Sequence, residues 1–274
     1  MNKWVFDLKD GIYKPNLDQQ IISYPDTGNQ DSFEIENNSP WFLQRNELIN
    51  FFVNKYDPQG DFLDIGSGNG FQSKSLMDNG YKYKVICCEP GYKGCLNSSI
   101  RDVKYIYNGF FQDFPFDDYN IKAIGLFDVI EHIEDDEDFL NTLYEKVPNE
   151  AMIFINVPAM KHLYSETDDF AGHFRRYNTK DIKRIIKKTN FQLVDYTFFF
   201  KFYYLPMLLL RVIPYIFGIR FGFKEIRKFE KNYLRNKKNI LDKISDYFHH
   251  LSMKQLSSGN RLSIGTSLFI VLKK

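Results

Sequence analysis

Residues 61–70 read DFLDIGSGNG, and this stretch decides the fold. Its apolar half predicts a short buried strand, and its glycines predict a tight turn into a helix over residues 71–80. The next predicted strand, residues 83–89, ends in the acidic residue Glu89. A glycine-rich loop between a strand and a helix, followed by an acid at the end of the next strand, is typical of nucleoside binding.

Strands and helices alternate on both sides of this loop. A helix is predicted over residues 39–56, with Ser39 as its N-cap and Pro40 in its first position. Further strands are predicted at 104–109, 123–128, 151–159, 191–199 and 267–274, and further helices at 137–147 and 179–190. The order predicts an α/β fold with a doubly wound, largely parallel sheet that binds its ligand at the carboxyl ends of the strands.

Composition excludes several classes of protein. The 274 residues are 43% hydrophobic and 26% charged, which fits one large globular domain with an insertion rather than a disordered chain. The formal net charge of +1 provides no global field, so no nucleic-acid partner is expected. The three cysteines form no disulfide framework, and the N-terminus lacks the apolar core of a signal peptide. We therefore expect a cytoplasmic protein.

Three segments are predicted along the chain: an N-terminal arm over 1–38, an α/β domain over 39–199 and 260–274, and a helical insertion over 200–259. The insertion combines an aromatic-aliphatic run with residues 220–243, which carry nine Lys/Arg against three Asp/Glu. It has no unbroken apolar stretch of the roughly 20 residues that a spanning helix needs. We expect a lid over the site; the alternatives are a dimer surface and a peripheral contact with the inner membrane face through 200–243. The oligomeric state stays open.

Three motifs, LDIGSGNG (63–70), CEPG (88–91) and FDVIEHIEDD (127–136), resemble those of the class I S-adenosylmethionine-dependent methyltransferases. They are similar in particular to the small-molecule group related to the ubiquinone-type O-methyltransferases. The resemblance covers about residues 33–200 and the last strand. It implies a Rossmann-like, seven-stranded sheet whose last strand is antiparallel. It also implies S-adenosyl-L-methionine as the cofactor and S-adenosyl-L-homocysteine as the product.

The resemblance further implies which residues bind the cofactor. The glycine loop would hold the methionine and ribose part, and Glu89 the ribose hydroxyls. Arg45 is a candidate partner for the cofactor's carboxylate; the alternative is a plain surface arginine. Phe110 replaces the aspartate that relatives often carry, so the following two residues are expected to flank the adenine ring. The complete expected set is Asp64, Gly66, Ser67, Gly68, Gly70, Glu89, Pro90, Phe111, Gln112, Phe127 and Arg45.

Catalytic residues are expected after the fourth strand and after the fifth. Asp128 and His132 follow the fourth strand and would lie near the reactive methyl group; the alternative for His132 is a structural role beside neighbouring carboxylates. The segment 165–177 resembles the D-x-x-x-G-H-x-R-R-Y loop of methyltransferases found with polysaccharide and lipid-precursor biosynthesis. His173 in this loop is the preferred general base.

The same loop supplies the expected acceptor-binding residues, which are Asp169, Arg175, Arg176 and Tyr177. Arginine forks suit a phosphate or carboxylate on the acceptor. The alternative is that the arginines pair with Asp168 and Asp169 and pin the loop. The acidic run at 134–138 lacks the spacing and glycine of a calcium loop and predicts a solvated helix start, so no metal is expected.

The expected reaction is O-methylation of a small-molecule, sugar or lipid-linked acceptor. N-methylation of an amine or amino sugar is the nearest alternative. Two further alternatives are a nucleoside-binding module without catalysis and an NAD(P)-dependent oxidoreductase. Phe71 stands where a dinucleotide-binding loop requires a small residue, which argues against the oxidoreductase.

Overall fold

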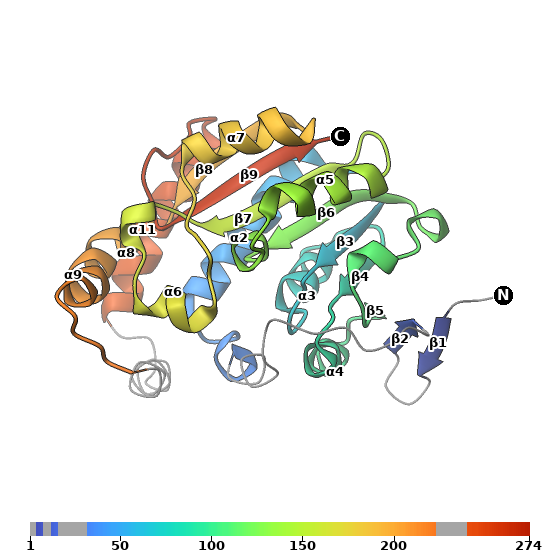
Figure 1. Ribbon diagram of the computed structural model, residues 1–274, viewed down its shortest axis with the longest axis horizontal. Helices are drawn as coiled ribbons and strands as arrows, with labels where there is room; N and C mark the ends of the chain where they lie inside the picture. The colour runs from blue at the N-terminus through green and yellow to red at the C-terminus, as the bar shows by residue number, and fades with distance from the viewer. Residues whose placement is uncertain (1–3, 8–11, 16–31, 223–239) are drawn as a thin grey trace.

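One sheet runs through the part of the chain that the computed structural model describes, residues 4–7, 12–15, 32–222 and 240–274. Within these residues the strand order is β1-β2-β5-β4-β3-β6-β7-β9-β8 (Figure 1). The five strands β3 to β7 are parallel, and β9 is antiparallel to both of its neighbours, β7 and β8. The strands are β1 Trp4–Asp7, β2 Ile12–Pro15, β3 Asp61–Ile65, β4 Val85–Cys88, β5 Tyr105–Tyr107, β6 Ile121–Phe127, β7 Met152–Pro158, β8 Gln192–Phe199 and β9 Ser267–Lys273.

The strand count is a correction to the sequence prediction. The doubly wound α/β fold and the antiparallel last strand are confirmed, but the described residues form nine strands rather than seven. The two additional strands lie in the predicted N-terminal arm: β2 pairs with β5 at Tyr13 and Tyr107, and β1 pairs with β2. Each has only four residues between turn formers, so the sequence shows too little alternation to predict them.

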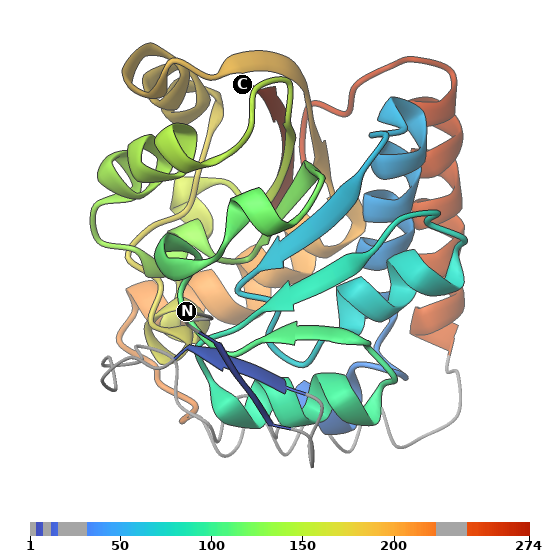
Figure 2. The same cartoon turned by 90° about the vertical axis from the view of Figure 1, so that its right-hand side faces the viewer.

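Helices cover both faces of the sheet. Figure 2 shows α2, α3 and α11 on one side of it and α5 and α7 on the other. The α-helices are α2 Pro40–Tyr56, α3 Phe71–Asp78, α4 Tyr92–Ile100, α5 Asp136–Lys146, α6 Glu166–Ala171, α7 Thr179–Thr189, α8 Lys201–Met207, α9 Ile213–Ile216 and α11 Ile240–Ser257. Short 3₁₀ helices are η1 Phe111–Asp113, η2 Phe116–Asp118, η3 Ile130–His132 and η4 Lys161–Leu163, and η5 Leu208–Val212 is a π-helix.

The four predicted helices of the α/β domain are present, and two helices were missed. Helix α4 follows Gly91, where no helix was predicted, and α6 lies within a segment predicted to be a loop. The acidic run forms the start of α5 as expected, but the predicted solvation is wrong for Asp136, which is 3% exposed and accepts a hydrogen bond from the Tyr177 hydroxyl. The Asp135 carboxylate accepts a hydrogen bond from the Asp138 backbone N–H at 2.9 Å, and further acids occupy the first turn, where the helix dipole favours negative charge.

Aromatic rings fill the core between α2 and the sheet. Phe52 of α2 is 2% exposed and stacks on Phe269 of β9, with 4.7 Å between the ring centroids. The opposite face of the sheet packs against Leu140 and Leu143 of α5 and against α7. Apolar side chains therefore pack against both faces of the sheet, in two separate layers.

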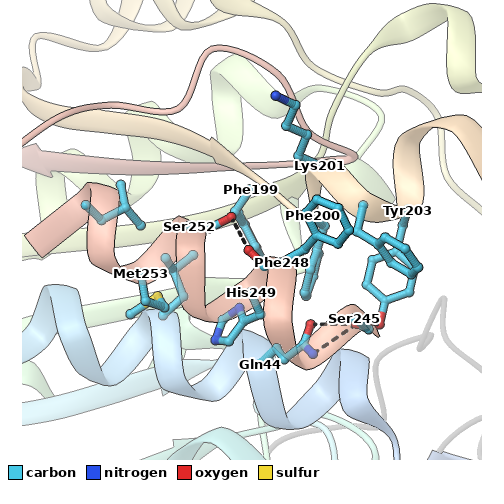
Figure 3. Close-up of a pocket in the computed structure, with 13 residues that line it drawn as sticks. Gln44, Phe199, Phe200, Lys201, Tyr203, Ser245, Phe248, His249, Ser252 and Met253 are labelled. Carbon is cyan, nitrogen blue, oxygen red and sulfur yellow. Dashed lines mark hydrogen bonds between the residues drawn. The ribbon is translucent and has the colours of Figure 1, made fainter. Parts of the chain in front are cut away.

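The insertion packs against α2 through α8 and α11. Gln44 donates a hydrogen bond to Ser245 Oγ at 3.0 Å, and the Tyr203 hydroxyl lies 2.7 Å from the same oxygen (Figure 3). The cavity drawn in Figure 3 has a volume of about 10 Å³, enough for about one water molecule. This region is a packing interface rather than a ligand pocket.

The insertion also presents apolar side chains at the surface. Leu210, Ile216 and Phe217 are 69%, 71% and 78% exposed. Among the described residues, no helix has both the length and the apolar character needed to cross a membrane. Most of the basic segment predicted over 220–243 lies outside the described residues, so the predicted membrane contact stays a hypothesis. The three cysteines are buried free thiols.

Replacing Phe52 by alanine is expected to lower the free energy of unfolding by about 3–5 kcal/mol, because the change removes a buried ring and leaves a cavity. Urea denaturation measures the loss. Leu210→Ala is the matched control, since an exposed leucine is expected to change stability by no more than about 0.5 kcal/mol. Equal losses in both variants would contradict the packing of α2 on the sheet.

Candidate active site

A cavity of about 830 Å³ opens at the carboxyl ends of the parallel strands. Its size suits a small-molecule ligand. Segments that follow β3, β4, β5, β6 and β7 line it, together with α2 and the insertion. The predicted site residues among its lining are Arg45, Gly66, Ser67, Gly68, Glu89, Pro90, Phe111, Gln112, Phe127, Asp128, His132, His173 and Arg176.

Glycine is required in the loop after β3. Gly66, Gly68 and Gly70 all have positive φ angles, of 67°, 53° and 68°. A Cβ at Gly66 would lie 2.8 Å from Val129 Cγ2, and a Cβ at Gly70 would lie 2.6 Å from Ser98 Oγ. Gly66 and Gly68 line the cavity and Gly70 does not, so the first two expose backbone to a ligand and the third permits close packing.

Glu89 ties this loop to the end of β4. Its carboxylate accepts hydrogen bonds from the Gly68 backbone N–H at 2.9 Å and from the Gly91 backbone N–H at 2.7 Å. Each carboxylate oxygen has a second acceptor site. The carboxylate therefore fixes the loop, and Glu89 also belongs to the lining of the cavity.

Asp64 lies beneath the loop rather than in the cavity lining. Its side chain is 1% exposed and accepts a hydrogen bond from Ser73 Oγ at 2.7 Å. Burial raises the pKa of Asp64 to about 7. The contact with Ser73 links β3 to α3, so in this structure Asp64 supports the loop from behind.

Arg45 reaches the cavity from α2 and is 3% exposed, so it is not a surface arginine. Its guanidinium group forms an ion pair with Asp128 and lies 4.8 Å from the centroid of the Trp41 ring. The other Asp128 oxygen accepts a hydrogen bond from Asn156 Nδ2 at 2.6 Å. One predicted cofactor-binding residue and one predicted catalytic residue are thus joined across the cavity.

Two histidines meet in the lining of the cavity. The rings of His132 and His173 are in edge-to-face contact, with 4.8 Å between their centroids. Burial, followed by the neighbouring His173, lowers the pKa of His132 to about 4, so this ring is neutral at physiological pH. Their separate positions in η3 and in the loop after α6 come together only in the folded chain.

Asp168 orients His173. The distance from Asp168 Oδ1 to His173 Nδ1 is 2.8 Å, and Arg176 Nε lies 2.9 Å from the same oxygen. Burial opposes ionisation of Asp168, but the contacts with His173 and Arg176 hold its pKa below the usual value. A carboxylate only accepts hydrogen bonds, so Asp168 favours a proton on Nδ1, and Nε2 lies on the side of Glu131, 4.0 Å from its Oε1.

The sequence analysis missed Glu131, which belongs to the same group of side chains. Glu131 is 0% exposed, lines the cavity, and has no hydrogen-bond partner for either carboxylate oxygen. Burial, with the nearby Asp128 charge, raises its pKa well above the usual value. The one sequence signal was its place next to His132 directly after a buried strand.

The insertion also contributes to the cavity, through Met207 and Arg211. Neither residue was predicted to belong to the site. Their stretch of sequence is apolar and aromatic and carries no motif, so only the tertiary structure shows that it turns back over the strand ends.

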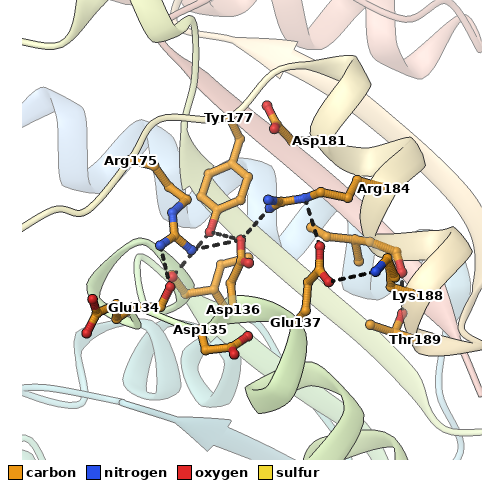
Figure 4. Close-up of polar contacts among 12 residues, drawn as sticks. Glu134, Asp135, Asp136, Glu137, Arg175, Tyr177, Asp181, Arg184, Lys188 and Thr189 are labelled. Atoms are coloured by element: carbon orange, nitrogen blue, oxygen red, sulfur yellow. Dashed lines mark hydrogen bonds and ion pairs between the residues drawn. The ribbon is translucent and has the colours of Figure 1, made fainter.

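The remaining predicted acceptor residues do not line the cavity. Arg175 lies 3.1 Å from Asp136 Oδ2, and the Tyr177 hydroxyl donates to the same oxygen at 2.9 Å (Figure 4). Asp169 accepts hydrogen bonds from the hydroxyls of Tyr164 and Tyr215, both at 2.9 Å. The alternative of loop-pinning ion pairs therefore describes Arg176 with Asp168, whereas Arg175 is tied to the start of α5.

A family model described as a methyltransferase domain matches residues 41–196, which is more than half of the chain. The chain therefore belongs to this methyltransferase-domain family. The match covers the glycine loop, Glu89, the FDVIEH motif and the loop that carries His173. No curated protein sequence matches the chain.

Solved structures of methyltransferases share the fold. Two structures of phosphoethanolamine N-methyltransferase 2 from Haemonchus contortus, one with S-adenosyl-L-methionine and one with phosphomonomethylethanolamine and S-adenosylhomocysteine, have TM-scores of 0.57 and 0.56. Both are 16% identical, with 96% of this chain and 62% of theirs covered. A methyltransferase from Archaeoglobus fulgidus has a TM-score of 0.49 at 15% identity, with coverages of 84% and 94%. The chain thus spans 62% of the length of the two nematode structures.

Asp64 predicts a specific pH dependence of stability. Its pKa is about 7 in the folded protein against 3.8 in an unperturbed carboxyl, so the folded state retains a proton that the unfolded chain has lost. Stability from this group is therefore present at low pH and lost as the pH rises from about 4 to about 7.

Asp64→Asn removes this titration. The free energy of unfolding of the variant is expected to rise relative to the wild type between pH 4 and pH 7 and to keep a constant difference above that range. Urea denaturation at intervals of half a pH unit provides the comparison. Parallel stability profiles for the two proteins would show that Asp64 does not titrate in this way.

Proposed function

We propose that this protein is an enzyme that transfers the methyl group of S-adenosyl-L-methionine to an oxygen of a small-molecule, sugar or lipid-linked acceptor. The observation that carries the proposal is the glycine loop held by Glu89 at the mouth of a cavity whose far end contains histidines and carboxylates. Membership of the methyltransferase-domain family supports the cofactor. When bound, the cofactor supplies an electrophilic methyl group.

The residues of the cavity fit this cofactor. Gly66 and Gly68 present backbone to the ligand, and Glu89 is placed to accept the ribose hydroxyls. Phe111 and Gln112 lie at the cavity wall beside β5, where an adenine ring would stack and hydrogen-bond. Arg45 is positioned to exchange its Asp128 partner for the carboxylate of the cofactor.

The opposite end of the cavity is suited to activation of the acceptor. Asp168 favours the proton on Nδ1 of His173, and in the neutral ring Nε2 then offers the lone pair. An acceptor hydroxyl loses its proton as the carbon–oxygen bond forms, so a lone pair at this place favours transfer to oxygen. Arg176 brings a fixed positive charge to the same wall, which suits an anionic group on the acceptor.

N-methylation is a second candidate. The Glu131 carboxyl is buried in the cavity with neither oxygen hydrogen-bonded, and an ammonium group is one possible partner for it. Methyl transfer to an amine needs no strong base. A hydroxyl acceptor and its amine counterpart, assayed side by side with radiolabelled cofactor, distinguish the two reactions.

The insertion acts in this proposal as a lid that extends the pocket for an apolar or lipid-linked acceptor. Met207 and Arg211 line the cavity, and leucines 205, 209 and 210 of the same segment are exposed beside it. A lipid-linked acceptor would bring this surface to the inner membrane face. We propose a cytoplasmic location, because the inner membrane face borders the cytoplasm.

Calorimetric titration with S-adenosylhomocysteine is expected to show one micromolar site, and titration with NADH is expected to show no binding. Glu89→Gln should weaken the binding of S-adenosylhomocysteine about 10- to 100-fold, because it removes charge-assisted hydrogen bonds worth about 1.5–3 kcal/mol each. Glu145→Gln, an exposed change on α5, is the matched control. Binding of NADH alone would favour the oxidoreductase, and binding of neither would overturn the proposal.

His173→Ala is expected to lower turnover at least about 100-fold while it changes S-adenosylhomocysteine affinity less than about threefold, because the residue lies at the acceptor end of the cavity. The assay uses an acceptor found by screening phosphorylated and lipid-linked sugars. His162→Ala, at the surface beside Tyr204, serves as the control. Equal losses of turnover and cofactor affinity would assign His173 a structural role.

A further inference from the structure

We propose that Glu131, His132 and His173 form a binding site for one divalent transition-metal ion at the acceptor end of the cavity. Each residue offers one ligand atom, and these atoms all lie within 4.8 Å of one another. The residues come from η3 and from the loop after α6, so the chain brings them together by folding and not by sequence spacing alone.

The spacing of the ligand atoms is close to what an ion requires. His173 Nε2 lies 4.0 Å from Glu131 Oε1. Around an ion with bonds of about 2.0–2.2 Å, neighbouring ligand atoms lie about 3–3.5 Å apart, so the side chains close by roughly an ångström on binding. Rotation about side-chain bonds supplies that movement without a change in the backbone.

The Glu131 carboxyl group points independently to a cationic ligand. It is 0% exposed, and neither of its oxygens has a hydrogen-bond partner. An unpartnered polar group that is fully buried costs roughly 1–3 kcal/mol, and more when it is charged. A metal ion would provide the missing partner, whereas a purely structural glutamate would be expected to have one within the protein.

Both histidines are already oriented as metal ligands usually are. The second ring nitrogen of a metal-bound histidine normally donates to a carboxylate or a backbone carbonyl. His173 has Asp168 Oδ1 at 2.8 Å from Nδ1, which leaves Nε2 toward Glu131. A ring N–H of His132 donates to the backbone carbonyl of Gly172, which is the kind of partner that a metal-bound histidine has on its second nitrogen.

The donor set selects the class of metal. Two imidazole nitrogens and one carboxylate oxygen suit zinc and other first-row transition ions, whereas magnesium and calcium prefer oxygen alone. Three protein ligands leave at least one coordination position open. Because Glu131, His132 and His173 all line the cavity, the open position is accessible to a ligand there.

This site would give the acceptor end of the cavity a definite chemistry. A metal ion lowers the pKa of a hydroxyl group that it binds, so it would activate an acceptor hydroxyl. His173 would then be a ligand of the metal rather than a free base. That role rests on the proposed methyl transfer to oxygen. Metal binding itself does not depend on it and is measured without cofactor or acceptor.

The test is metal titration of untagged, chelator-stripped protein. Competition with a colorimetric zinc chelator is expected to show one equivalent of Zn²⁺ bound with micromolar or tighter affinity, and Mg²⁺ is expected to bind far more weakly. One equivalent of Co²⁺ should produce visible absorption bands characteristic of nitrogen and oxygen ligands. S-adenosylhomocysteine titration of the same samples reports separately on the proposed function.

Variants locate the site. Glu131→Gln and His173→Ala are each expected to lower zinc affinity at least about 100-fold, and Asp168→Asn about 10- to 100-fold because it acts through His173. His162→Ala is the matched control and is expected to retain wild-type affinity. Thermal unfolding without metal checks that each variant folds. If a variant does not fold, the Co²⁺ spectrum of the wild type tests whether nitrogen and oxygen atoms bind the metal.

Two results would overturn the inference. One is a wild-type protein that binds no stoichiometric Zn²⁺ or Co²⁺ while it still binds S-adenosylhomocysteine. The other is unchanged zinc affinity in folded Glu131→Gln and His173→Ala proteins. The first result would favour N-methylation, because the Glu131 carboxylate would then be left to pair with an amine acceptor rather than with a metal ion.

Discussion

Parallel pairing of β3, β4, β5, β6 and β7 is the constraint on which the rest of this structure depends. Parallel strands end at the same edge, so every segment that follows a strand contributes to one place. The cavity lining reflects this arrangement, because it contains the glycine loop after β3, Glu89 after β4, Phe111 after β5 and Asp128 after β6. Two apolar layers, one on each face, pack against these strands.

The two ends of the cavity differ in their physical character. At the loop after β3, negative charge is compensated by backbone N–H groups, as Glu89 shows with Gly68 and Gly91. At the opposite end, Asp168 is compensated by His173 and Arg176, whereas Glu131 is not compensated by a hydrogen bond. A ligand that contacts Glu89 needs hydrogen-bond donors. A ligand that contacts Glu131 needs a positive charge or a bound metal ion.

The insertion shows how an element outside the sheet takes part in the site. Its α11 is held on α2 through Gln44 and Ser245, and α2 also carries Arg45 into the cavity. One helix, α2, therefore contacts the insertion and also carries an arginine of the cavity lining. Met207 and Arg211 of this segment line the cavity, whereas Leu205, Leu209 and Leu210 are exposed.

Residue patterns alone predicted the strands β3 to β9, the glycine loop and the helices α2, α3, α5 and α7, because period and turn chemistry are local properties. They did not predict α4 between β4 and β5. The sequence also placed Glu89, Asp128 and His132 at strand ends. It did not predict β1 and β2, which are short; β2 pairs with β5, and β1 pairs with β2. Only the tertiary structure decided that Arg45 pairs with Asp128, that Arg175 turns away to Asp136, and that Glu131 meets His173. Partner choice among charged side chains depends on distances in space, which residue order does not contain.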